Sequence, residues 1–400
     1  MPKQTVRDVE WSGKRALVRV DFNVPFEREP GESQSARISD DIRIREALPT
    51  INYLRERGAG VLLCTHLGRP GGHVDPSLEL TPIAARLAEL LGTPVSYVHD
   101  APGDGARQAA GELRAGEVAL LENIRFWPGE EANDPDFARA LADLADAYVN
   151  DAFGTAHRAH ASTAGVASFL PAVAGLLMDK ELTFLGGALH DPKRPMAAVL
   201  GGAKVSDKLK VLQRLIGHAD ALFVGGGMAA TFLRARGLPV GASLVEDDLV
   251  DACAAMLTDA EDKGTRLELP TDVVVAERIE AGTETRTIPA SEIPDGWMVL
   301  DIGPGTATRY ADLLATLGTV VWNGPMGVFE VPPFDAGTRA VADAIAHSAA
   351  VSIIGGGSTA EAVGSLGLAD RMTHVSTGGG ASLEFLEGRE LPGVAALADA

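Results

Sequence analysis

Short polar segments rich in arginine and histidine are the part of this sequence best suited to bind a small anion. Most of them follow an apolar run, and each contains arginine or histidine. A guanidinium fork binds carboxylate or phosphate in two-point geometry more specifically than an ammonium group does. The segments therefore predict a pocket for a small, strongly anionic ligand. They are Arg19–Pro25 (RVDFNVP), Asp40–Arg45 (DDIRIR), His66–Pro70 (HLGRP), Leu121–Phe126 (LENIRF) and Gly154–His160 (GTAHRAH).

The composition limits which ligands and compartments are plausible. The chain has 35 basic and 55 acidic residues and a formal net charge of -20, which excludes a broad basic face for nucleic acid. The two cysteines, Cys64 and Cys253, are far apart, so we expect a reducing cytoplasm rather than a disulfide framework. The sequence contains no apolar signal segment and no run of about 18 apolar residues. We therefore expect a soluble, cytoplasmic protein with no membrane partner.

Glycine-rich segments occupy the corresponding positions in the second half of the chain. Glycine permits close backbone approach and leaves N–H groups at a helix N-terminus free for phosphate, so several such loops at one sheet edge predict a nucleotide site. No Walker-type P-loop motif is present. The segments are Leu200–Lys208 (LGGAKVSDK), Val224–Phe232 (VGGGMAATF), Asp301–Thr308 (DIGPGTAT), Trp322–Glu330 (WNGPMGVFE), Ile353–Ala362 (IIGGGSTAEA) and Ser376–Phe385 (STGGGASLEF).

Two lysines in the first of these segments strengthen the prediction. Lys204 and Lys208 are four residues apart, so a helix starting here would present both ammonium groups on one face near its positive end. That placement is unfavourable unless an anion neutralises the two charges. The pair therefore favours a phosphate ligand over a merely solvated surface.

The elements that must position these segments follow from the hydrophobic pattern. Short apolar runs alternate with longer amphipathic segments, which implies parallel sheets with helices on both faces. Ligands of such sheets bind beyond the carboxyl ends of the strands. Helices are expected at Leu80–Leu91, Ser206–Ile216 and Thr338–His347, with a connector over Ala164–Leu189 that becomes helical from Met178. Strands are expected at Ala16–Val20, Val61–Cys64, Val118–Leu121, Ala147–Asn150, Met196–Leu200, Ala221–Val224, Val299–Asp301, Thr319–Trp322, Val351–Ile354 and His374–Ser376.

Taken together, the motifs resemble those of one family, phosphoglycerate kinase, in the family's order and across essentially the whole chain. The resemblance rests on RVDFNVP, HLGRP, LENIRF, DAFGTAHRAHAS, GGAKVSDK, VGGGMA, WNGPMGVFE and STGGGASLEF. It implies an α/β fold of two doubly wound, Rossmann-like domains joined by a hinge. Residues 1–172 with about 387–400 would bind 3-phosphoglycerate or 1,3-bisphosphoglycerate, and residues 173–386 would bind ADP or ATP with Mg²⁺. A monomer is expected, without a nucleic-acid partner.

The resemblance also assigns roles to individual residues. Arg43, Lys204, Gly357 and Gly380 would be catalytic, with Arg43 and Lys204 stabilising the migrating phosphoryl group. The phosphoglycerate would be bound by Asp21, Phe22, Asn23, Arg43, His66, Leu67, Gly68, Arg69, Arg125 and Arg158. The nucleotide would be bound by Lys204, Lys208, Gly225, Asn323, Pro325, Glu330, Gly356, Gly357, Ser358 and Thr359. From the residues alone, Arg19 could be either a structural ion-pair partner or a ligand.

One position departs from the family pattern. Where the family usually has Gly-Gly-Asp followed by threonine or serine, this chain has Gly356-Gly357-Ser358-Thr359. The family's aspartate binds magnesium, and a neutral hydroxyl is a poorer ligand for a hard cation. We expect Ser358 to contact the metal directly or through water, with weaker metal affinity as the consequence.

Two alternatives to an active kinase remain at this point. Ser358 could mark a relative that binds both substrates without turnover. A nicotinamide-dependent dehydrogenase would fit Gly225-x-Gly227-x-x-Ala230 and Gly355-x-Gly357-x-x-Ala360, which both match the short dinucleotide pattern. The dehydrogenase alternative leaves the arginine segments without a role.

Overall fold

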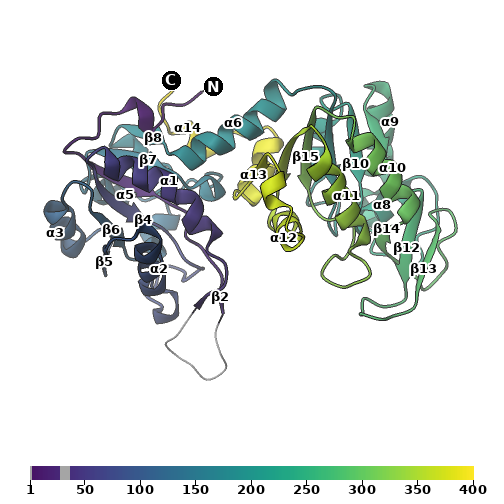
Figure 1. Cartoon of the computed structure of the whole chain (residues 1–400), viewed down its shortest axis with the longest axis horizontal. Coiled ribbons are helices and arrows are strands. Elements are labelled where there is room, and N and C mark those ends of the chain that lie inside the picture. Colours follow the sequence, from purple (N-terminus) through teal and green to yellow (C-terminus); the bar gives the residue numbers. More distant parts are fainter. Residues whose placement is uncertain (1, 28–36) are drawn as a thin grey trace. The chain divides into compact units, whose positions relative to one another are not determined.

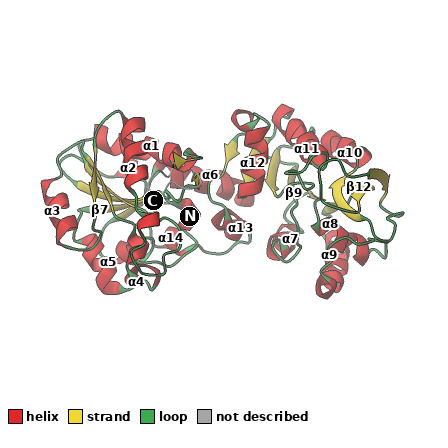
Figure 2. Cartoon of the chain, turned by 90° about the horizontal axis from the view of Figure 1, so that it is seen from below, coloured by secondary structure: helices red, strands yellow, loops and turns green. Residues whose placement is uncertain are grey.

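The computed structural model of the chain describes residues 2–27 and 37–400 and contains two compact units (Figure 1). The first unit comprises Met1–Thr183 and Glu390–Ala400, and the second comprises Phe184–Arg389. In each unit, helices lie on both sides of a mainly parallel sheet (Figure 2). The predicted fold class, two doubly wound α/β units, is confirmed. Within the described ranges, no helix is long and apolar enough to cross a membrane.

The first unit is built around a six-stranded parallel sheet with strand order β5-β6-β4-β1-β7-β8. Its strands are β1 (Arg15–Arg19), β4 (Gly60–Cys64), β5 (Val95–Val98), β6 (Val118–Leu121), β7 (Ala147–Asn150) and β8 (Ala172–Ala174), beside a small hairpin of β2 (Phe26–Glu27) and β3 (Arg37–Ile38). Its helices are α1 (Ile42–Glu56), α2 (Thr81–Leu91), α3 (Asp104–Glu112), α4 (Pro128–Glu131), α5 (Pro135–Ala142) and α14 (Pro392–Ala395), and α6 (Leu176–His190) leads out of it.

Alternation along β1 explains how this sheet is covered. Ala16 and Val18 belong to the core that includes Ile44 of α1 and Ile83 of α2. Successive side chains of a strand point to opposite faces, so Arg19 emerges on the other face. Figure 2 shows α1 and α2 on one side of the sheet and α4 and α5 on the other. The arginine that interrupts this apolar strand therefore lies under the α4–α5 layer.

The second unit has its own six-stranded parallel sheet, in the order β11-β10-β9-β15-β16-β17. Figure 2 shows α10, α11 and α12 on one side of this sheet and α7, α8 and α9 on the other. The strands are β9 (Met196–Leu200), β10 (Ala221–Val224), β11 (Arg266–Glu268), β15 (Thr319–Asn323), β16 (Val351–Gly355) and β17 (His374–Val375). The helices are α7 (Leu209–Leu215), α8 (Met228–Ala235), α9 (Val250–Asp262), α10 (Pro304–Leu314), α11 (Ala336–His347), α12 (Gly357–Ser365) and α13 (Gly380–Leu386).

A separate antiparallel sheet adjoins the second unit's core. It shows that one strand was predicted with the wrong pairing. It contains β12 (Asp272–Ala276), β13 (Thr285–Pro289) and β14 (Met298–Ile302), with β12 in the middle. The run Val299–Asp301 was expected as a parallel strand, but β14 runs antiparallel to β12. The reason is that no helix lies between β12 and β14, and antiparallel partners need no helical crossover.

The division between the units also differs from the expected one. Ala172–Ala174 pair in parallel with β7, so the chain after residue 172 still belongs to the first sheet. The boundary therefore lies at Thr183, within α6, and the returning C-terminal segment begins at Glu390. The N–H of Gln4 donates to the carbonyl of Ala398 at 2.9 Å, which fastens that segment to the N-terminal one.

The helix expected from Ser206 begins later, at Leu209, with Lys208 as its N-cap residue. Lys204 and Lys208 therefore lie in the loop before the helix, and the prediction that they share a helical face was wrong. The loop leads from the end of β9 to α7, so both lysines remain at the carboxyl edge of the sheet.

Candidate active site

The predicted anion-binding residues of the first unit gather where its strand order reverses. β1 lies between β4 and β7, and the chain proceeds outward from β1 in both directions. Such a switch point leaves a crevice beyond the carboxyl ends of the strands. Asp21 and Asn23 follow β1, His66 follows β4, Arg125 follows β6 and Arg158 follows β7. The fold thus brings four segments that are distant in sequence to one edge.

Arg43 reaches this edge from the first turn of α1. Its Nη1 donates to Oδ2 of Asp21 at 2.9 Å. Asn23 holds the next segment in place, because its Oδ1 accepts from the N–H of Gly68 at 3.0 Å. These bonds join the segments after β1 and β4 to the start of α1.

Arg125 provides the clearest sign of an anionic ligand. Its side chain is only 3% exposed, and Nη1 donates to the carbonyl of Gly68 at 2.7 Å. Nη2 is sealed from solvent and has no hydrogen-bond partner among the described residues. Burial, and then the neighbouring charge of Arg158, lower the pKa of Arg125 to about 10. A buried cationic donor without an acceptor costs free energy that an anion at this position would offset.

The other residues predicted to bind the phosphoglycerate differ in how far their side chains are exposed. Phe22 and Leu67 are buried in the core shared with α1 and α2, so their side chains pack rather than bind. Arg69 is exposed and forms no ion pair among residues 2–27 and 37–400. Arg158 is partly buried, and its Nε donates to Nε2 of His157 at 3.3 Å.

Arg19 is a buried structural residue. It is 1% exposed, and each of its guanidinium nitrogens has a protein partner: Ser162, the carbonyl of Val20, and His66. The sequence had left its role open between structure and ligand binding. Because each nitrogen is bonded to the protein and the side chain is sealed from solvent, Arg19 supports the anion-binding residues from behind rather than meeting a ligand.

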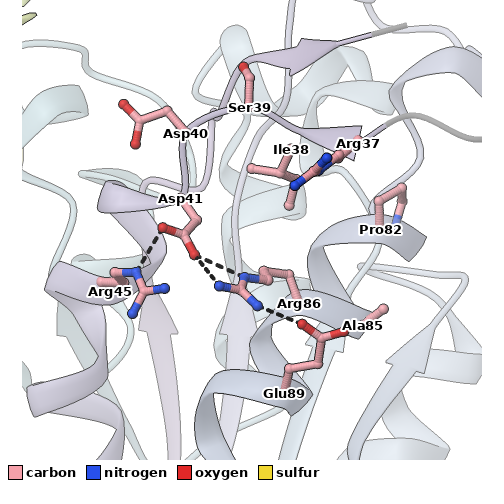
Figure 3. A pocket seen from close by; sticks show the side chains of 10 residues that line it. All are labelled: Arg37, Ile38, Ser39, Asp40, Asp41, Arg45, Pro82, Ala85, Arg86 and Glu89. Atoms are coloured by element: carbon pink, nitrogen blue, oxygen red, sulfur yellow. Dashed lines mark hydrogen bonds and ion pairs between the residues drawn. The ribbon is translucent and has the colours of Figure 1, made fainter. Parts of the chain in front are cut away.

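A cavity of about 660 Å³ lies beside the N-terminal end of α1 (Figure 3). Asp41 lines this cavity and precedes Arg43 by two residues in the sequence. Arg45 Nε donates to Oδ1 of Asp41 at 2.8 Å, and Arg86 donates to Oδ2 through Nε at 2.9 Å and Nη2 at 2.8 Å. Arg86 also donates to Glu89 at 2.6 Å. Because Arg86 belongs to α2, its two hydrogen bonds to Asp41 tie α2 to the start of the helix that carries Arg43.

Four of the six glycine-rich segments of the second unit line one cavity of about 360 Å³, whereas Val224–Phe232 and Asp301–Thr308 contribute no residue to its lining. It lies at the other reversal of strand order, between β9 and β15. Of the residues predicted to meet the nucleotide or the transferring group, those lining it are Lys204, Lys208, Asn323, Pro325, Gly356, Gly357, Ser358, Thr359 and Gly380. Gly201, Gly202, Ala203, Asp207, Gly324, Gly379 and Leu383 also line it, and most of them belong to the motifs quoted from the sequence.

Backbone and side-chain contacts fix the shape of this cavity. Lys208 Nζ donates to Oδ1 of Asn323, and burial lowers the pKa of Lys208. Thr359 Oγ1 accepts from the N–H of Gly324 at 2.7 Å, which joins the segments after β15 and β16. Gly356, the N-cap of α12, has φ of 86°, a conformation that favours glycine. The first N–H groups of α12 therefore face the cavity without a side-chain cap.

The loop that carries Lys204 is braced by a residue that the sequence patterns did not identify. Glu246 accepts from the N–H and hydroxyl of Ser206 at 3.0 and 2.5 Å. Although burial opposes the shift, the hydrogen bonds from Ser206 lower the pKa of Glu246, and Lys204 adds to the effect. No motif marked Glu246, which is about forty positions from the loop that it braces.

Two predicted nucleotide residues do not line the cavity. Glu330 is exposed beyond the end of β15. Gly225 follows β10, and a Cβ there would lie 2.5 Å from Sδ of Met326. By contrast, a Cβ on Gly357 would meet nothing within 4 Å. Gly225 is thus required for packing between loops, which accounts for one match to the dinucleotide pattern, whereas Gly357 leaves open space next to α12.

Comparisons with known proteins agree with this geometry. A family model described as phosphoglycerate kinase matches residues 6–389. The phosphoglycerate kinase of Herpetosiphon aurantiacus is 56% identical over 399 residues, covering 100% of both chains. That of Rubrobacter xylanophilus is 57% identical over 397 residues, covering 99% of this chain and 98% of the other.

Solved structures show the same likeness. The phosphoglycerate kinase of Coxiella burnetii superposes with a TM-score of 0.90 at 41% identity, and that of Pyrococcus horikoshii with 0.85 at 36%. Each alignment covers 99% of this chain and 98% of the other. With an arginine cradle in one unit, a glycine-lined cavity in the other and relatives matched along their full length, the chain belongs to the phosphoglycerate kinase family.

Proposed function

We propose that the chain carries out the family's glycolytic reaction, reversible phosphoryl transfer between 1,3-bisphosphoglycerate and ADP, with one substrate bound on each unit. The phosphoglycerate binds the cradle of Arg43, His66, Arg125 and Arg158. The nucleotide binds the glycine-lined cavity with Lys204 and Lys208. The observation that carries the assignment is the convergence of Arg43, Arg125 and Arg158 at one edge of the first sheet, where the buried Nη2 of Arg125 has no acceptor among the described residues.

The reaction requires positioning of the reactants and neutralisation of charge, and these residues can supply both. In either direction the acceptor oxygen is already ionised, a carboxylate or a diphosphate oxygen, so no strong general base is needed. The protein must position the reactants and neutralise charge on the transferring group. Arg43 and Lys204 are the cations suited to that role, because Arg43 lies at the cradle and Lys204 is an exposed ammonium lining the nucleotide cavity.

The donors that line the nucleotide cavity fit magnesium. The side-chain oxygens suited to a hard cation there are the Ser358 hydroxyl and the Asp207 carboxylate. Within the described residues, no group of three or more His, Cys, Asp or Glu side chains could hold a metal. Ser358, directly or through water, would hold Mg²⁺ with the nucleotide phosphates as the other ligands. When bound, the ion supplies charge neutralisation on the phosphate oxygens.

The hinge implied by the resemblance belongs to the same proposal, as do the monomeric state and the cytoplasmic location expected from the sequence. A hinge would let both substrates bind in the open form and exclude water once both are present, which suppresses hydrolysis. Both six-stranded sheets are already flanked by the chain's own helices, which favours a monomer.

The decisive experiment is 3-phosphoglycerate-dependent formation of ADP from ATP, with Arg125→Met beside the natural protein. Losing a charged hydrogen bond should raise the KM for 3-phosphoglycerate about tenfold to a hundredfold, with the KM for ATP nearly unchanged. Arg114→Met, at an exposed arginine outside the cradle, is the matched control. Binding of both substrates without turnover by the natural protein would instead identify an idle relative, and an unchanged KM in Arg125→Met would refute the cradle.

A further inference from the structure

We propose that a buried chain of hydrogen bonds running from Glu130 through Ser162 and Arg19 holds His66 as a neutral imidazole with its proton on Nε2, so that His66 donates to the bound anion. Glu130, Ser162 and Arg19 are then positioning residues that act through His66. The inference rests on the proposed function only for the nature of the anion.

The geometry of Arg19 determines the protonation of His66. Arg19 Nη2 lies 3.1 Å from Nδ1 of His66. A guanidinium carries donors only, so Nδ1 must be the acceptor and cannot carry a proton. Protonating it would bring two N–H groups of two cations together in a site where His66 is 3% exposed and Arg19 is 1% exposed. The neutral ring must therefore carry its proton on Nε2.

Nε2 is free to serve a ligand. It forms no hydrogen bond to another described residue, and it is not a sealed polar atom without a partner. The ring belongs to the segment after β4, at the edge where Arg43, Arg125 and Arg158 converge. A neutral N–H donor can bind a phosphate oxygen without adding a further charge to this crowded group of cations.

The hydrogen bonds on the other side of Arg19, to Ser162 and Glu130, explain why Arg19 stays in place. Arg19 Nε donates to Oγ of Ser162 at 2.9 Å. Ser162 in turn donates through Oγ to Oε1 of Glu130 at 2.7 Å, and its N–H donates to Oε2 at 2.9 Å. Glu130 and Ser162 are both 0% exposed. Arg19 therefore donates in two directions, to Nδ1 of His66 and to Oγ of Ser162, and Ser162 passes the second series on to the Glu130 carboxylate.

Taken together, the charged groups that face His66 also favour the neutral imidazole. Asp21 Oδ1 lies 3.9 Å from Nδ1 and is the one acidic group near the ring among the described residues, but Arg43 Nη1 already neutralises that carboxylate at 2.9 Å. Burial, and then the charges of Arg19, Arg125, Arg158 and Arg43, lower the pKa of His66 well below its ordinary value. Burial and the four arginines therefore outweigh Asp21, whose charge alone would favour the imidazolium form.

The tautomer can be measured directly in the ligand-free protein. Long-range ¹H–¹⁵N NMR distinguishes a protonated from an unprotonated ring nitrogen, and the spectrum of His66→Gln assigns the signal. We expect an unprotonated Nδ1 and a protonated Nε2 at pH 7, with no titration of His66 near its ordinary pKa. In Arg19→Met, we expect His66 to lose this fixed tautomer. A signal for Nδ1–H, or for imidazolium at pH 7, would overturn the proposal.

The positioning role needs a second readout, which is 3-phosphoglycerate affinity by calorimetry. Ser162→Ala breaks the chain between Glu130 and Arg19 and should weaken binding about fivefold to tenfold, the effect of losing one buried hydrogen bond. Tyr148→Phe is the matched control, because Tyr148 donates at 2.7 Å to the carbonyl of the same Ser162 without joining the chain.

Equal losses in the two variants would show that Ser162 is merely structural, and the positioning role would then be wrong. Ser162→Ala must also broaden or shift the His66 ring signals, whereas Tyr148→Phe should leave them unchanged. If the natural protein bound no 3-phosphoglycerate, the proposed function would fail, whereas the NMR result would still decide the tautomer independently.

Discussion

Arg43 and Asp21 form an ion pair of 2.9 Å between the first turn of α1 and the segment after β1. The arginine is therefore positioned before any substrate arrives, by a carboxylate of the substrate cradle itself. Its side chain remains 32% exposed, which leaves part of the guanidinium available. A cation held in advance at the place where charge develops needs little reorganisation during the reaction.

Arg43→Met should lower kcat about 100-fold to 1,000-fold, the usual cost of removing one group that stabilises transition-state charge. The KM for 3-phosphoglycerate should change much less, because Arg125 and Arg158 remain. Steady-state kinetics in the direction of ADP formation provide the measurement. Arg57→Gln, at the other end of α1, is the control and should have little effect. A raised KM for 3-phosphoglycerate with unchanged kcat would show instead that Arg43 binds the substrate and the transition state equally.

Arg86→Met tests whether α2 steadies the helix that carries Arg43. Losing the two hydrogen bonds to Oδ2 of Asp41 should lower kcat about threefold to tenfold, in line with a partly exposed ion pair that has two donors on one carboxylate oxygen. Arg45→Gln removes a bond to the same carboxylate within α1 alone, so it should leave kcat nearly unchanged (Figure 3). Arg86→Lys should recover only part of the activity. Identical kinetics for Arg86→Met and Arg45→Gln would disprove the link between α2 and Arg43.

The parts of the fold that sequence reasoning predicted share one physical property. Buried parallel strands such as Val118–Leu121 and Ala147–Asn150 are continuous apolar runs, so their pattern identifies them almost to the residue. Edge strands such as β5 and β11 carry mixed residues, because one edge lacks a partner, and no apolar run marked them. The antiparallel order of β12 to β14 depends on pairing across distant residues, which local patterns do not contain.

At the candidate site, too, local sequence patterns predicted only some of the important residues. Residues that meet a ligand stand in compact motifs, and the structure brings most of them together at the two sheet edges. Glu130 and Glu246 support those residues from outside the quoted motifs, and Ser162, at the end of DAFGTAHRAHAS, was assigned no role from the sequence. Their side chains are ordinary polar groups, and their importance appears only when the partner they hold is known. Supporting residues of this kind therefore need a structure to be found.

Asp151→Asn should change how stability depends on pH. Asp151 is fully buried after β7 and accepts from the N–H groups of Leu177 and Met178, at the start of α6. Burial raises the pKa of Asp151 to about 7 from its ordinary 3.8. Between these values the native state binds the proton and the unfolded state does not, so this residue's contribution to stability falls as pH rises through the window.

Asparagine cannot ionise, so the variant should gain stability relative to the natural protein between about pH 4 and pH 7. The gain should be of order 2–4 kcal/mol, at about 1.4 kcal/mol per pKa unit. Urea unfolding at several pH values measures it. Asp146→Asn is the control, because the hydrogen bond from Arg15 lowers the pKa of Asp146, so the stability difference it causes should be constant above about pH 4 and should vary only below it. A stability difference for Asp151→Asn that is flat with pH would contradict the prediction.

Ser358→Asp should restore tighter magnesium binding. Ser358 is exposed at the start of α12, in the cavity of Lys204 and Lys208, and a carboxylate is a stronger ligand for a hard cation than a hydroxyl. Its negative charge also suits the positive end of the helix. In a titration of magnesium at fixed ATP, half-maximal activity should occur at about tenfold lower metal concentration in the variant, since one charged ligand contributes roughly 1.4 kcal/mol or more. The control is Ser365→Asp, which places the same substitution at the opposite end of α12 and should leave the magnesium titration unchanged. Coincident titration curves for Ser358→Asp and the natural protein would contradict the prediction. They would mean that the nucleotide phosphates and water already complete the coordination of the metal, so that serine at this position does not weaken magnesium binding.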